Sequence, residues 1–242
     1  MTVLFDVANE GTAYPPVIST WAQLIASFDN DASAYSSYDT LDVVTQDSTA
    51  SNWPDGIGAL DLATVTGAPV HDSTPGEVLF DGTNDTFADA QTFSGNWTLI
   101  VRFRCDAGAD VSPIGLSNHA ESTNGRASIF VGSARTSVSA IWNSDAPADN
   151  TRSVTMTVGT GYHVAFLRYD GTNLILRVDD ETPASLAISG AATLTRLTVG
   201  CLQQAASQFY HHDGGISHVA AVNGRCLTDG EEDTALAFLL AL

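Results

Sequence analysis

Short runs of alternating apolar and polar residues dominate the chain from about residue 96 onward. The clearest run covers residues 96–104, and alternation with a period of two is typical of a strand with one buried face. One face of this run carries Trp97, Leu99, Val101 and Phe103, and the other carries Thr98, Arg102 and Arg104. We therefore predict a half-buried strand here.

The same pattern recurs along the rest of the chain. We predict further strands at Ala127–Val131, Val138–Trp142, Val154–Val158, His163–Tyr169, Leu174–Asp179, Leu194–Val199 and Ile216–Val222. Turn residues separate these runs, and no long amphipathic stretch lies between them to make the crossovers of a parallel sheet. The pattern predicts an all-β fold, an antiparallel jelly-roll β-sandwich.

One segment predicts a tight hairpin. Residues 162–181 read YHVAFLRYDGTNLILRVDDE, in which an Asp-Gly-Thr-Asn turn separates two apolar runs. Such a turn needs a residue with positive φ, which glycine supplies. Nearly the same turn occurs in Phe80–Asp85. We therefore expect hairpin to follow hairpin along most of the chain.

Only the C-terminal end reads as a helix. Thr228 can cap it, and Glu231 lies three residues later, which is the spacing of a capping box. Acidic residues crowd the positive end of the helix dipole. Leu236, Leu239 and Leu240 can face the core. The sequence therefore predicts a short C-terminal helix.

The N-terminal part divides into an arm and the start of one domain. Residues 1–18 are predicted to form an arm, because the Pro15-Pro16 pair favours extended structure. Such an arm packs on a neighbouring subunit or stays disordered, and both remain open. Residues 19–242 then form the domain. Residues 19–28 fit one helical turn or a first strand, and residues 29–77 predict loops with short strands.

Composition limits the partners. The chain has 242 residues, 44% of them hydrophobic, which suffices for one large β domain with a full core. Asp and Glu number 28 against nine arginines and no lysine, a net charge of −19. This charge argues against nucleic acid and anionic membranes as partners, since both attract cationic side chains. A solubilising acidic surface, a salty environment or calcium bound by loop carboxylates would each explain it.

Cysteine usage and the N-terminus add two expectations. Cys105, Cys201 and Cys226 show no CxxC spacing, so we predict small buried residues rather than a disulfide framework or zinc site. The N-terminus has acidic residues where a secretion signal has basic ones, and no apolar run approaches the roughly 18 residues of a membrane span. We expect no membrane insertion, and synthesis in a cytoplasm where the chain stays or from which a larger particle carries it.

Four fragments carry a resemblance to known domains: Val78–Asp85, Asn96–Phe103, the hairpin of residues 162–181 and the closing Val219–Glu231. Their order resembles the laminin-G-like, concanavalin-A-like lectin/glucanase superfamily. Domains with this closing strand and terminal helix look like those of tailed-phage virion proteins such as fibres, spikes and head decorations. The resemblance implies a virion structural protein whose partners are other capsid or tail proteins.

No catalytic constellation is predicted. The resemblance implies that a glucanase would carry Glu-x-Asp-x-x-Glu on one strand, which places its acid and nucleophile on one face. The chain has only six glutamates, and none has this spacing. The motifs of acyl transfer, zinc hydrolysis and nucleotide binding are absent from the sequence. We therefore expect a protein that is not an enzyme.

Calcium is the cofactor that the sequence allows. The superfamily often binds this ion at the sandwich rim, and hard cations prefer oxygen ligands. Asp81, Asn84 and Asp85 form the best candidate cluster, or else they build the turn by bonding their own backbone. The second candidate cluster is Asp179, Asp180 and Glu181.

Histidines offer a less specific metal signal. His211, His212 and Asp213, with His218 five residues on, have the residue types of a transition-metal site but match no established spacing. On a strand, His218 shares a face with Ile216 and Ala220, which favours a satisfied histidine of the core or of a groove.

Aromatic residues in loops suggest sugar binding, because a flat ring covers the apolar face of a pyranose while nearby Asp and Asn accept hydrogen bonds. Trp53 and Asp55 lie in an Asn-Trp-Pro-Asp-Gly loop, and Trp53 fits a core or subunit contact equally well. Tyr210 is a further candidate for glycan binding, and weaker ones are Tyr35 and Tyr38. Trp97 and Trp142 fit strand cores better.

Together these observations predict a concanavalin-A-like sandwich with a short arm, acting as a non-enzymatic virion protein. It would decorate a head or form the exposed domain of a spike or fibre, contact host-surface glycans, and form a symmetric homo-oligomer. A free-standing lectin-like adhesion module and a polysaccharide-degrading enzyme are the alternatives.

Overall fold

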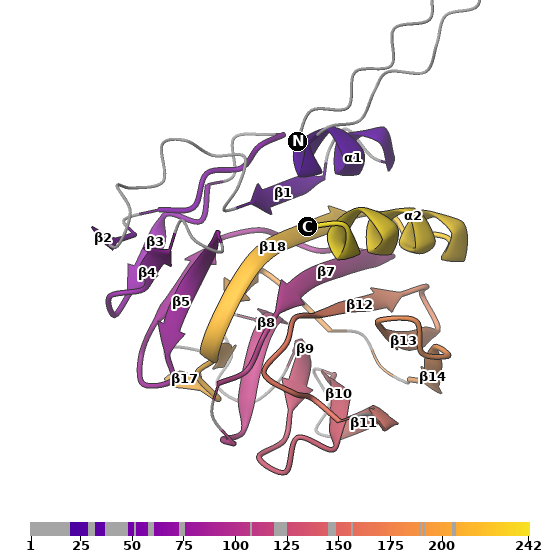
Figure 1. Cartoon of the computed structure of the whole chain (residues 1–242). Helices are drawn as coiled ribbons and strands as arrows, with labels where there is room; N and C mark the ends of the chain where they lie inside the picture. Colours follow the sequence, from indigo (N-terminus) through magenta and orange to yellow (C-terminus); the bar gives the residue numbers. More distant parts are fainter. Residues whose placement is uncertain are drawn as a thin grey trace, which may run out of the picture.

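The computed structural model describes residues 20–28, 32–36, 48–50, 52–57, 61–72, 76–106, 108–118, 125–144, 149–155, 157–188, 190, 192–204 and 207–242. The predicted arm, residues 1–18, lies outside them. The described chain consists of antiparallel strands in two large sheets with two short helices (Figure 1).

The first sheet has nine strands. They are β1 (Ser33–Ser36), β2 (Ser48–Thr49), β4 (Val70–Asp72), β5 (Glu77–Asp81), β7 (Trp97–Phe103), β12 (His163–Tyr169), β13 (Asn173–Val178), β14 (Ala184–Ala187) and β18 (Asp213–Asn223). Their order is β14-β13-β12-β7-β18-β5-β4-β2, and β1 pairs with β18. The long strands β7 and β18 therefore form the centre of this sheet.

The second sheet has seven strands. They are β3 (Thr64–Thr66), β6 (Thr86–Asp89), β8 (Val111–Ser117), β9 (Arg126–Val131), β10 (Ser137–Asn143), β11 (Asp149–Thr155) and β15 (Arg196–Val199). Their order is β11-β10-β9-β8-β15-β6-β3. A separate hairpin joins β16 (Leu202–Gln204) to β17 (Ser207–Phe209), and the helices are α1 (Trp21–Phe28) and α2 (Asp229–Leu240).

One hydrophobic core fills the space between the two sheets. Leu99 and Val101 of β7, Val219 of β18, and Leu116 and Ile129 of the second sheet all belong to it and are fully buried. Burying one face of each of two antiparallel sheets is the defining feature of a β-sandwich. The predicted fold class is confirmed.

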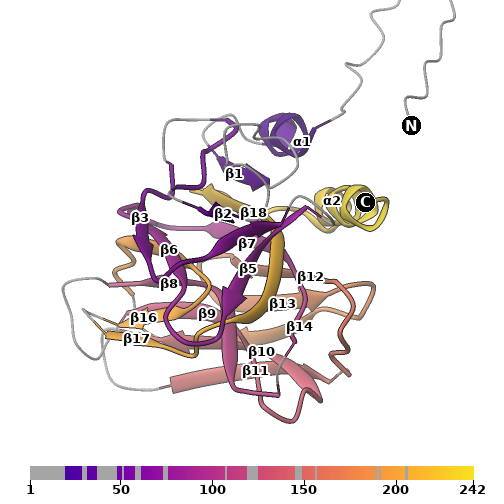
Figure 2. The ribbon, with the colours of Figure 1, turned by 60° about the vertical axis from the view of Figure 1, so that its left-hand side comes forward.

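A second apolar cluster covers the outer face of the nine-stranded sheet. Ile100, Phe166 and Ala220 point outward from β7, β12 and β18, and they pack against Trp21 of α1 and Leu239 of α2. Both helices lie on this side of the molecule, and β10 and β11 lie on the other side (Figure 2). Every residue of β7 is buried, so the prediction of a half-buried strand is wrong: helices cover its second face.

The two similar turns have different roles. The hairpin of residues 162–181 is confirmed, since β12 pairs with β13 and Gly171 has a φ of 93°. The turn in Phe80–Asp85 instead connects β5 of the first sheet to β6 of the second. Hairpins therefore alternate with connections between sheets, which the turn sequence alone does not distinguish.

Three strands differ from the prediction for local reasons. β8 was not predicted because it contains Pro113, which lacks the N–H of a strand ladder; a register shift between Val111 and Ile114 accommodates it. β11 begins at Asp149 rather than Val154, and it is the edge strand of its sheet. β18 extends back through Gly214 and Gly215, two weak strand formers.

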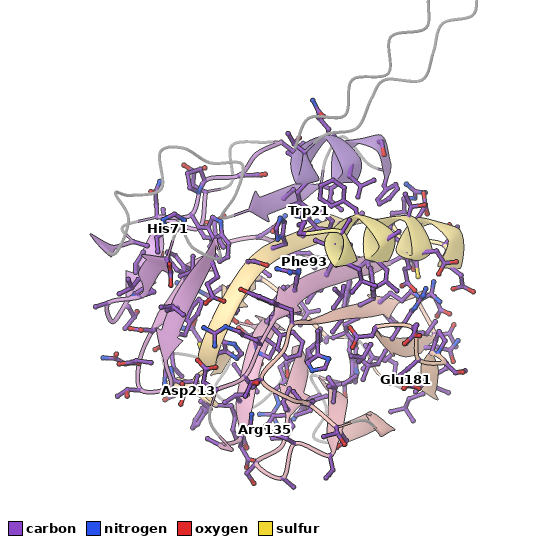
Figure 3. All side chains as sticks on the ribbon, in the orientation of Figure 1. Trp21, His71, Phe93, Arg135, Glu181 and Asp213 are labelled. Atoms are coloured by element: carbon purple, nitrogen blue, oxygen red, sulfur yellow. The ribbon has the colours of Figure 1, made fainter. Side chains whose placement is uncertain are left out.

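The C-terminal helix is confirmed together with its capping box of Thr228 and Glu231. Leu236 and Leu239 are buried, but Leu240 is 62% exposed, so its predicted core position is wrong. Ala235 takes that place in the second cluster. Residues 21–28 form a helix rather than a strand, and the Trp21 indole N–H donates to the Val219 carbonyl at 2.9 Å. Figure 3 shows Trp21 between α1 and β18.

An ionic network occupies the part of this outer face beyond the helices. Glu77 is fully buried, and the Arg104 guanidinium donates to both of its carboxylate oxygens. The Tyr162 hydroxyl donates to the same carboxylate, and burial and this hydrogen bond raise the pKa of Tyr162. A Cβ at Gly215 would lie 1.7 Å from Glu77 Oε2, so only glycine leaves room for the carboxylate.

We predict that Gly215→Ala lowers the free energy of unfolding by about 3 kcal/mol or more, because Glu77 must leave Arg104 or the strand must shift. Urea unfolding measures this. Gly230→Ala in α2 is the matched control: nothing lies within 4 Å of its Cβ position, and there the same change should stabilise the protein by about 0.5–1 kcal/mol. Equal small effects from both substitutions would contradict the packing described.

Candidate functional site

The outer face of the seven-stranded sheet is polar. Ala127, Leu116 and Leu197 point into the core between the sheets. Because side chains alternate along a strand, their neighbours Arg126, Ser117 and Arg196 point to the outer face. This is the face opposite to the one that the helices cover.

Register places these three residues side by side. Arg196 of β15 is opposite Ser117 of β8, and Ser117 is opposite Arg126 of β9. Arg126 is in turn opposite Asn143 of β10. Neighbouring strands are about 4.8 Å apart, so the two arginine backbones lie roughly 10 Å apart with the serine between them. We call Arg196, Ser117, Arg126 and Asn143 the arginine row.

The floor of this face contains buried hydroxyl groups. Ser117 is 1% exposed and Ser128 is fully buried, and neither hydroxyl has a hydrogen-bond partner among the described residues. Ser128 is opposite Gly115, and the Leu202 side chain lies over this glycine, 3.4 Å from where its Cβ would be. Thr198 differs, because its hydroxyl donates to the Gly115 and Cys201 carbonyls. Unpaired buried hydroxyls are uncommon in proteins.

An aromatic pair lies at the other end of the same face. Phe130 points outward from β9, and its ring meets the Tyr210 ring edge to face at 5.0 Å. Tyr210 follows β17 and is 43% exposed. Its φ is 54°, and its carbonyl accepts a hydrogen bond from the Ser112 N–H at 2.8 Å, which fixes this backbone. Phe130 is four residues from Arg126, about 13 Å along the strand.

Arg126 and Arg196 have polar or electrostatic contacts of their own, as do the arginines elsewhere in the described chain. Arg104, Arg168, Arg177 and Arg225 each form an ion pair with a carboxylate of the first sheet or of its helix α2 and flanking loops. The chain has a net charge of −19, yet the register of the seven-stranded sheet places two positively charged residues, Arg126 and Arg196, in one row across its strands. Such a site favours an anionic group by direct hydrogen bonding and charge.

The predicted sugar residue Trp53 lies elsewhere. It is fully buried, bridges to Leu62, and packs against Phe87 in the core. A ring in this position has no free face for a sugar; it makes the core contact that the sequence allowed equally well. Asp55 builds the same loop: its Oδ1 accepts hydrogen bonds from the Ala34 and Ile57 N–H groups, each at 3.0 Å.

Tyr210 is the predicted glycan residue that the structure places on an exposed surface, on the outer face beside Phe130. Its role in glycan binding stays a prediction. Tyr38 and the side chain of Tyr35 lie outside the described residues. Trp97 and Trp142 are buried, as expected of strand residues.

The predicted calcium residues hold the turn between β5 and β6. Asp81 Oδ1 accepts from the Thr83 N–H at 2.8 Å. Asp85 Oδ1 accepts from the Ala68 N–H at 2.6 Å, and its Oδ2 accepts from the Asp81 N–H at 3.1 Å. Asn84 is exposed in the same turn. In the described chain no group of three His, Cys, Asp or Glu residues is arranged to hold a metal, and calcium binding stays a prediction.

The second acidic cluster also forms a turn. Asp179 has a φ of 51°; its Oδ1 accepts from the Val164 N–H at 2.7 Å, and its Oδ2 lies 2.8 Å from His163 Nδ1. Asp180 and Glu181 are exposed. Asp213, the first residue of β18, lies near Arg135 (Figure 3). The Arg135 guanidinium donates to the Cys105 carbonyl at 3.0 Å.

The histidines are mostly interior. The His212 ring packs between Phe80 and Phe103, and burial lowers its pKa to about 4. His218 is 1% exposed beneath Trp21, and burial together with the Arg102 charge lowers its pKa to about 3. His211 is half-buried, and burial lowers its pKa as well.

The arginine row was not predicted from the sequence. Arg126 directly precedes the predicted strand Ala127–Val131, and Arg196 occupies a polar position of the predicted strand Leu194–Val199. Their meeting depends on β8, which joins the two strands and was not predicted. The one available signal was that two of nine basic residues stand at outward positions of alternating strands.

Solved structures with a similar sandwich include carbohydrate-binding and receptor-binding domains. The CBM40 domain of Ruminococcus gnavus IT-sialidase bound to α2,3-sialyllactose is 14% identical, covers 60% of this chain and 82% of its own, and has a TM-score of 0.50. The binding domain of botulinum neurotoxin DC in complex with SialylT is 10% identical and covers 87% of this chain, with a TM-score of 0.60.

A further receptor binding domain is 8% identical and covers 89% of this chain, with a TM-score of 0.63. This chain spans 52% of the neurotoxin domain and 53% of that receptor binding domain. At these identities the likeness establishes the fold, an all-β lectin-like sandwich. No protein-family model matches the chain, and no curated protein matches it. None of the described helices is long and apolar enough to cross a membrane.

The buried histidines predict a loss of stability in acid. Their folded pKa values lie below the unfolded value of about 6.5, so the unfolded state binds more protons as the pH falls below 6.5. Between pH 7 and pH 5 each contributes a loss of about 2 kcal/mol. His212→Leu should therefore lose about 2 kcal/mol less than the natural protein over this interval. Urea unfolding at both pH values tests this, and equal losses would contradict it.

Proposed function

We propose that this domain is a non-enzymatic, lectin-like module that binds an acidic glycan on the outer face of its seven-stranded sheet. The observation that carries the proposal is the arginine row, in which Arg196 and Arg126 flank Ser117 across three neighbouring strands. The fold shared with sialyllactose-bound and receptor-binding domains supports it.

The arginine row suits a sugar carboxylate. A guanidinium presents donors in a fixed fork that matches a carboxylate, and such charge-assisted bonds are the strong ones. Sialyllactose carries one carboxylate and many hydroxyls. Ser117 lies between the two arginines, and its hydroxyl is buried and unpaired among the described residues.

The aromatic pair completes the site. An exposed tyrosine ring covers the apolar face of a neutral sugar residue while its hydroxyl stays in water. Arg126 and Phe130 are about 13 Å apart along β9, so a short oligosaccharide that reaches both would pass over the buried Ser128 and the neighbouring Leu202. The acidic sugar would then lie at the arginine row, and the next sugar residues would approach Tyr210.

The buried glutamates suit structural roles better than catalysis. Glu77 is hydrogen-bonded to Arg104 and Tyr162. Glu232 is fully buried in α2 between Arg168 and Arg177, and burial raises its pKa to about 7. Neither lies on the outer polar face, which supports a function in binding rather than in bond cleavage.

The finer placement in a virion stays a prediction. It comes from the sequence resemblance to tailed-phage spikes, fibres and head decorations, as do the expected capsid or tail partners. A homo-oligomer likewise stays a prediction. Stoichiometric recovery of the chain with purified particles, measured by mass spectrometry, would support the virion role, and its recovery only in the free fraction would contradict it.

Titration calorimetry with 3′-sialyllactose, 6′-sialyllactose and lactose tests the proposed function. We expect both sialylated sugars to bind more tightly than lactose. Arg126→Gln and Arg196→Gln should each weaken sialyllactose binding about tenfold or more, since a hydrogen bond to a charged group contributes about 1.5–3 kcal/mol. Tyr210→Ala should weaken sialyllactose and lactose alike.

Arg225→Gln is the matched control, because Arg225 pairs with Glu231 beside α2 and not on this face. It should leave the affinity for sialyllactose unchanged. Equal affinity for lactose and sialyllactose would contradict the role of the arginine row. Failure to bind any member of a broad glycan array would contradict glycan binding itself.

A further inference from the structure

A cavity of about 270 Å³ lies at the end of the sandwich where β7 begins. Trp97 of β7 and Tyr169 of β12 line it from the first sheet, and Trp142 of β10 lines it from the second. Phe93, Ala192 and Leu194 close it from the adjoining loops. The remaining lining residues among those the structure describes are one serine and two glycines, so none of the described lining residues is charged.

Three aromatic rings that contact one another line the cavity. Trp97 and Trp142 are nearly parallel, with centroids 6.5 Å apart and planes at 14°. The Tyr169 ring lies 5.0 Å from that of Trp142, and its hydroxyl donates to the Gly171 carbonyl at 2.9 Å. The tyrosine hydroxyl is therefore already engaged.

Trp142, one of the lining residues, carries a buried polar group without a partner. Trp142 is 1% exposed, and its indole N–H has no hydrogen-bond acceptor among the described residues. An unpaired buried donor is costly and requires a reason. An acceptor atom on a molecule bound in the cavity would supply one.

The rim of the cavity is held in place. The Phe93 N–H donates to the Leu194 carbonyl at 2.8 Å. Asn223, at the end of β18, accepts from the Ser94 N–H at 3.3 Å and donates to the Thr92 carbonyl at 2.6 Å. Ligand sites are typically preformed in this way, mostly apolar with a few fixed polar groups.

Size and chemistry identify the class of ligand. An apolar protein cavity of about 150 Å³ is enough to hold benzene, so the larger cavity here accommodates a substituted ring. A sugar would bring several hydroxyls into a wall that leaves them unpaired, which is unfavourable. A charged ligand would lose its hydration without a counter-charge.

We propose that this cavity is a second binding site, distinct from the outer polar face, for a small uncharged ring compound with one hydrogen-bond acceptor. The rings of Trp97, Trp142 and Tyr169 contact the apolar part of the ligand. The Trp142 indole N–H donates to the acceptor. The site does not depend on glycan binding at the outer face.

Three probes of similar shape test this on the full chain: acetophenone, ethylbenzene and benzoate. Acetophenone has the ring and an acceptor, ethylbenzene lacks the acceptor, and benzoate is charged. Indole N–H signals in ¹H–¹⁵N NMR spectra report binding. Acetophenone should shift the Trp142 signal saturably, and ethylbenzene and benzoate should each bind about fivefold or more weakly, the loss expected for one hydrogen bond or a desolvated charge.

Two variants test the Trp142 hydrogen bond and the cavity volume separately. Trp142→Phe keeps an aromatic wall without the N–H, so acetophenone and ethylbenzene should then bind equally, as followed by the remaining tryptophan signals. Ala192→Leu fills the cavity from its half-buried rim and should weaken acetophenone binding about tenfold. No saturable shift with acetophenone, tightest binding of benzoate, or a retained preference for acetophenone in Trp142→Phe would each overturn the proposal.

Discussion

The structure depends on the antiparallel pairing of β7 with β18, two long strands that are buried on both faces. Their inner side chains, such as Leu99 and Val219, form the core between the sheets. Their outer side chains, such as Ile100 and Ala220, are covered by α1 and α2. A strand pair buried on both sides cannot shift its register without exposing one set or the other.

This constraint assigns different roles to the two outer faces of the sandwich. The helices and the ion pair of Glu77 with Arg104 cover the outer face of the nine-stranded sheet. The seven-stranded sheet has no helix upon it in the described chain, and its outward residues include serines, arginines and one aromatic pair. This is the face on which we propose that a glycan binds. The pairing of β7 with β18 also positions one end of the sandwich, because Trp97 and Asn223 are opposite each other beside the aromatic cavity.

The sequence predicted what depends on local patterns. Alternation located β7, β12 and most of β18, the Asp-Gly turn located one hairpin, and Thr228 with Glu231 located the C-terminal helix. The sequence did not predict β8, because Pro113 is unusual within a strand. It also did not predict that the chain crosses from one sheet to the other at Phe80–Asp85. Turn chemistry is the same whether the following strand pairs with its predecessor or joins another sheet.

The candidate site was less predictable than the fold, and for a related reason. The sequence does not show whether an aromatic residue in a loop is buried: Trp53 is in the core, and Tyr210 is exposed. Arg126 and Arg196 are 70 positions apart in the chain, and the intervening β8 brings them level with Ser117. Such a row exists only once the register of three strands is known.

The central claim is that the seven-stranded sheet offers the binding face while the helix-covered face is structural. Backbone amide shifts of the ¹⁵N-labelled protein titrated with 3′-sialyllactose test it most directly. The account predicts shifts confined to β8, β9, β15 and the residues around Tyr210, with none in α1 or α2. Shifts centred on α2 and β12, or spread evenly over both sheets, would contradict it.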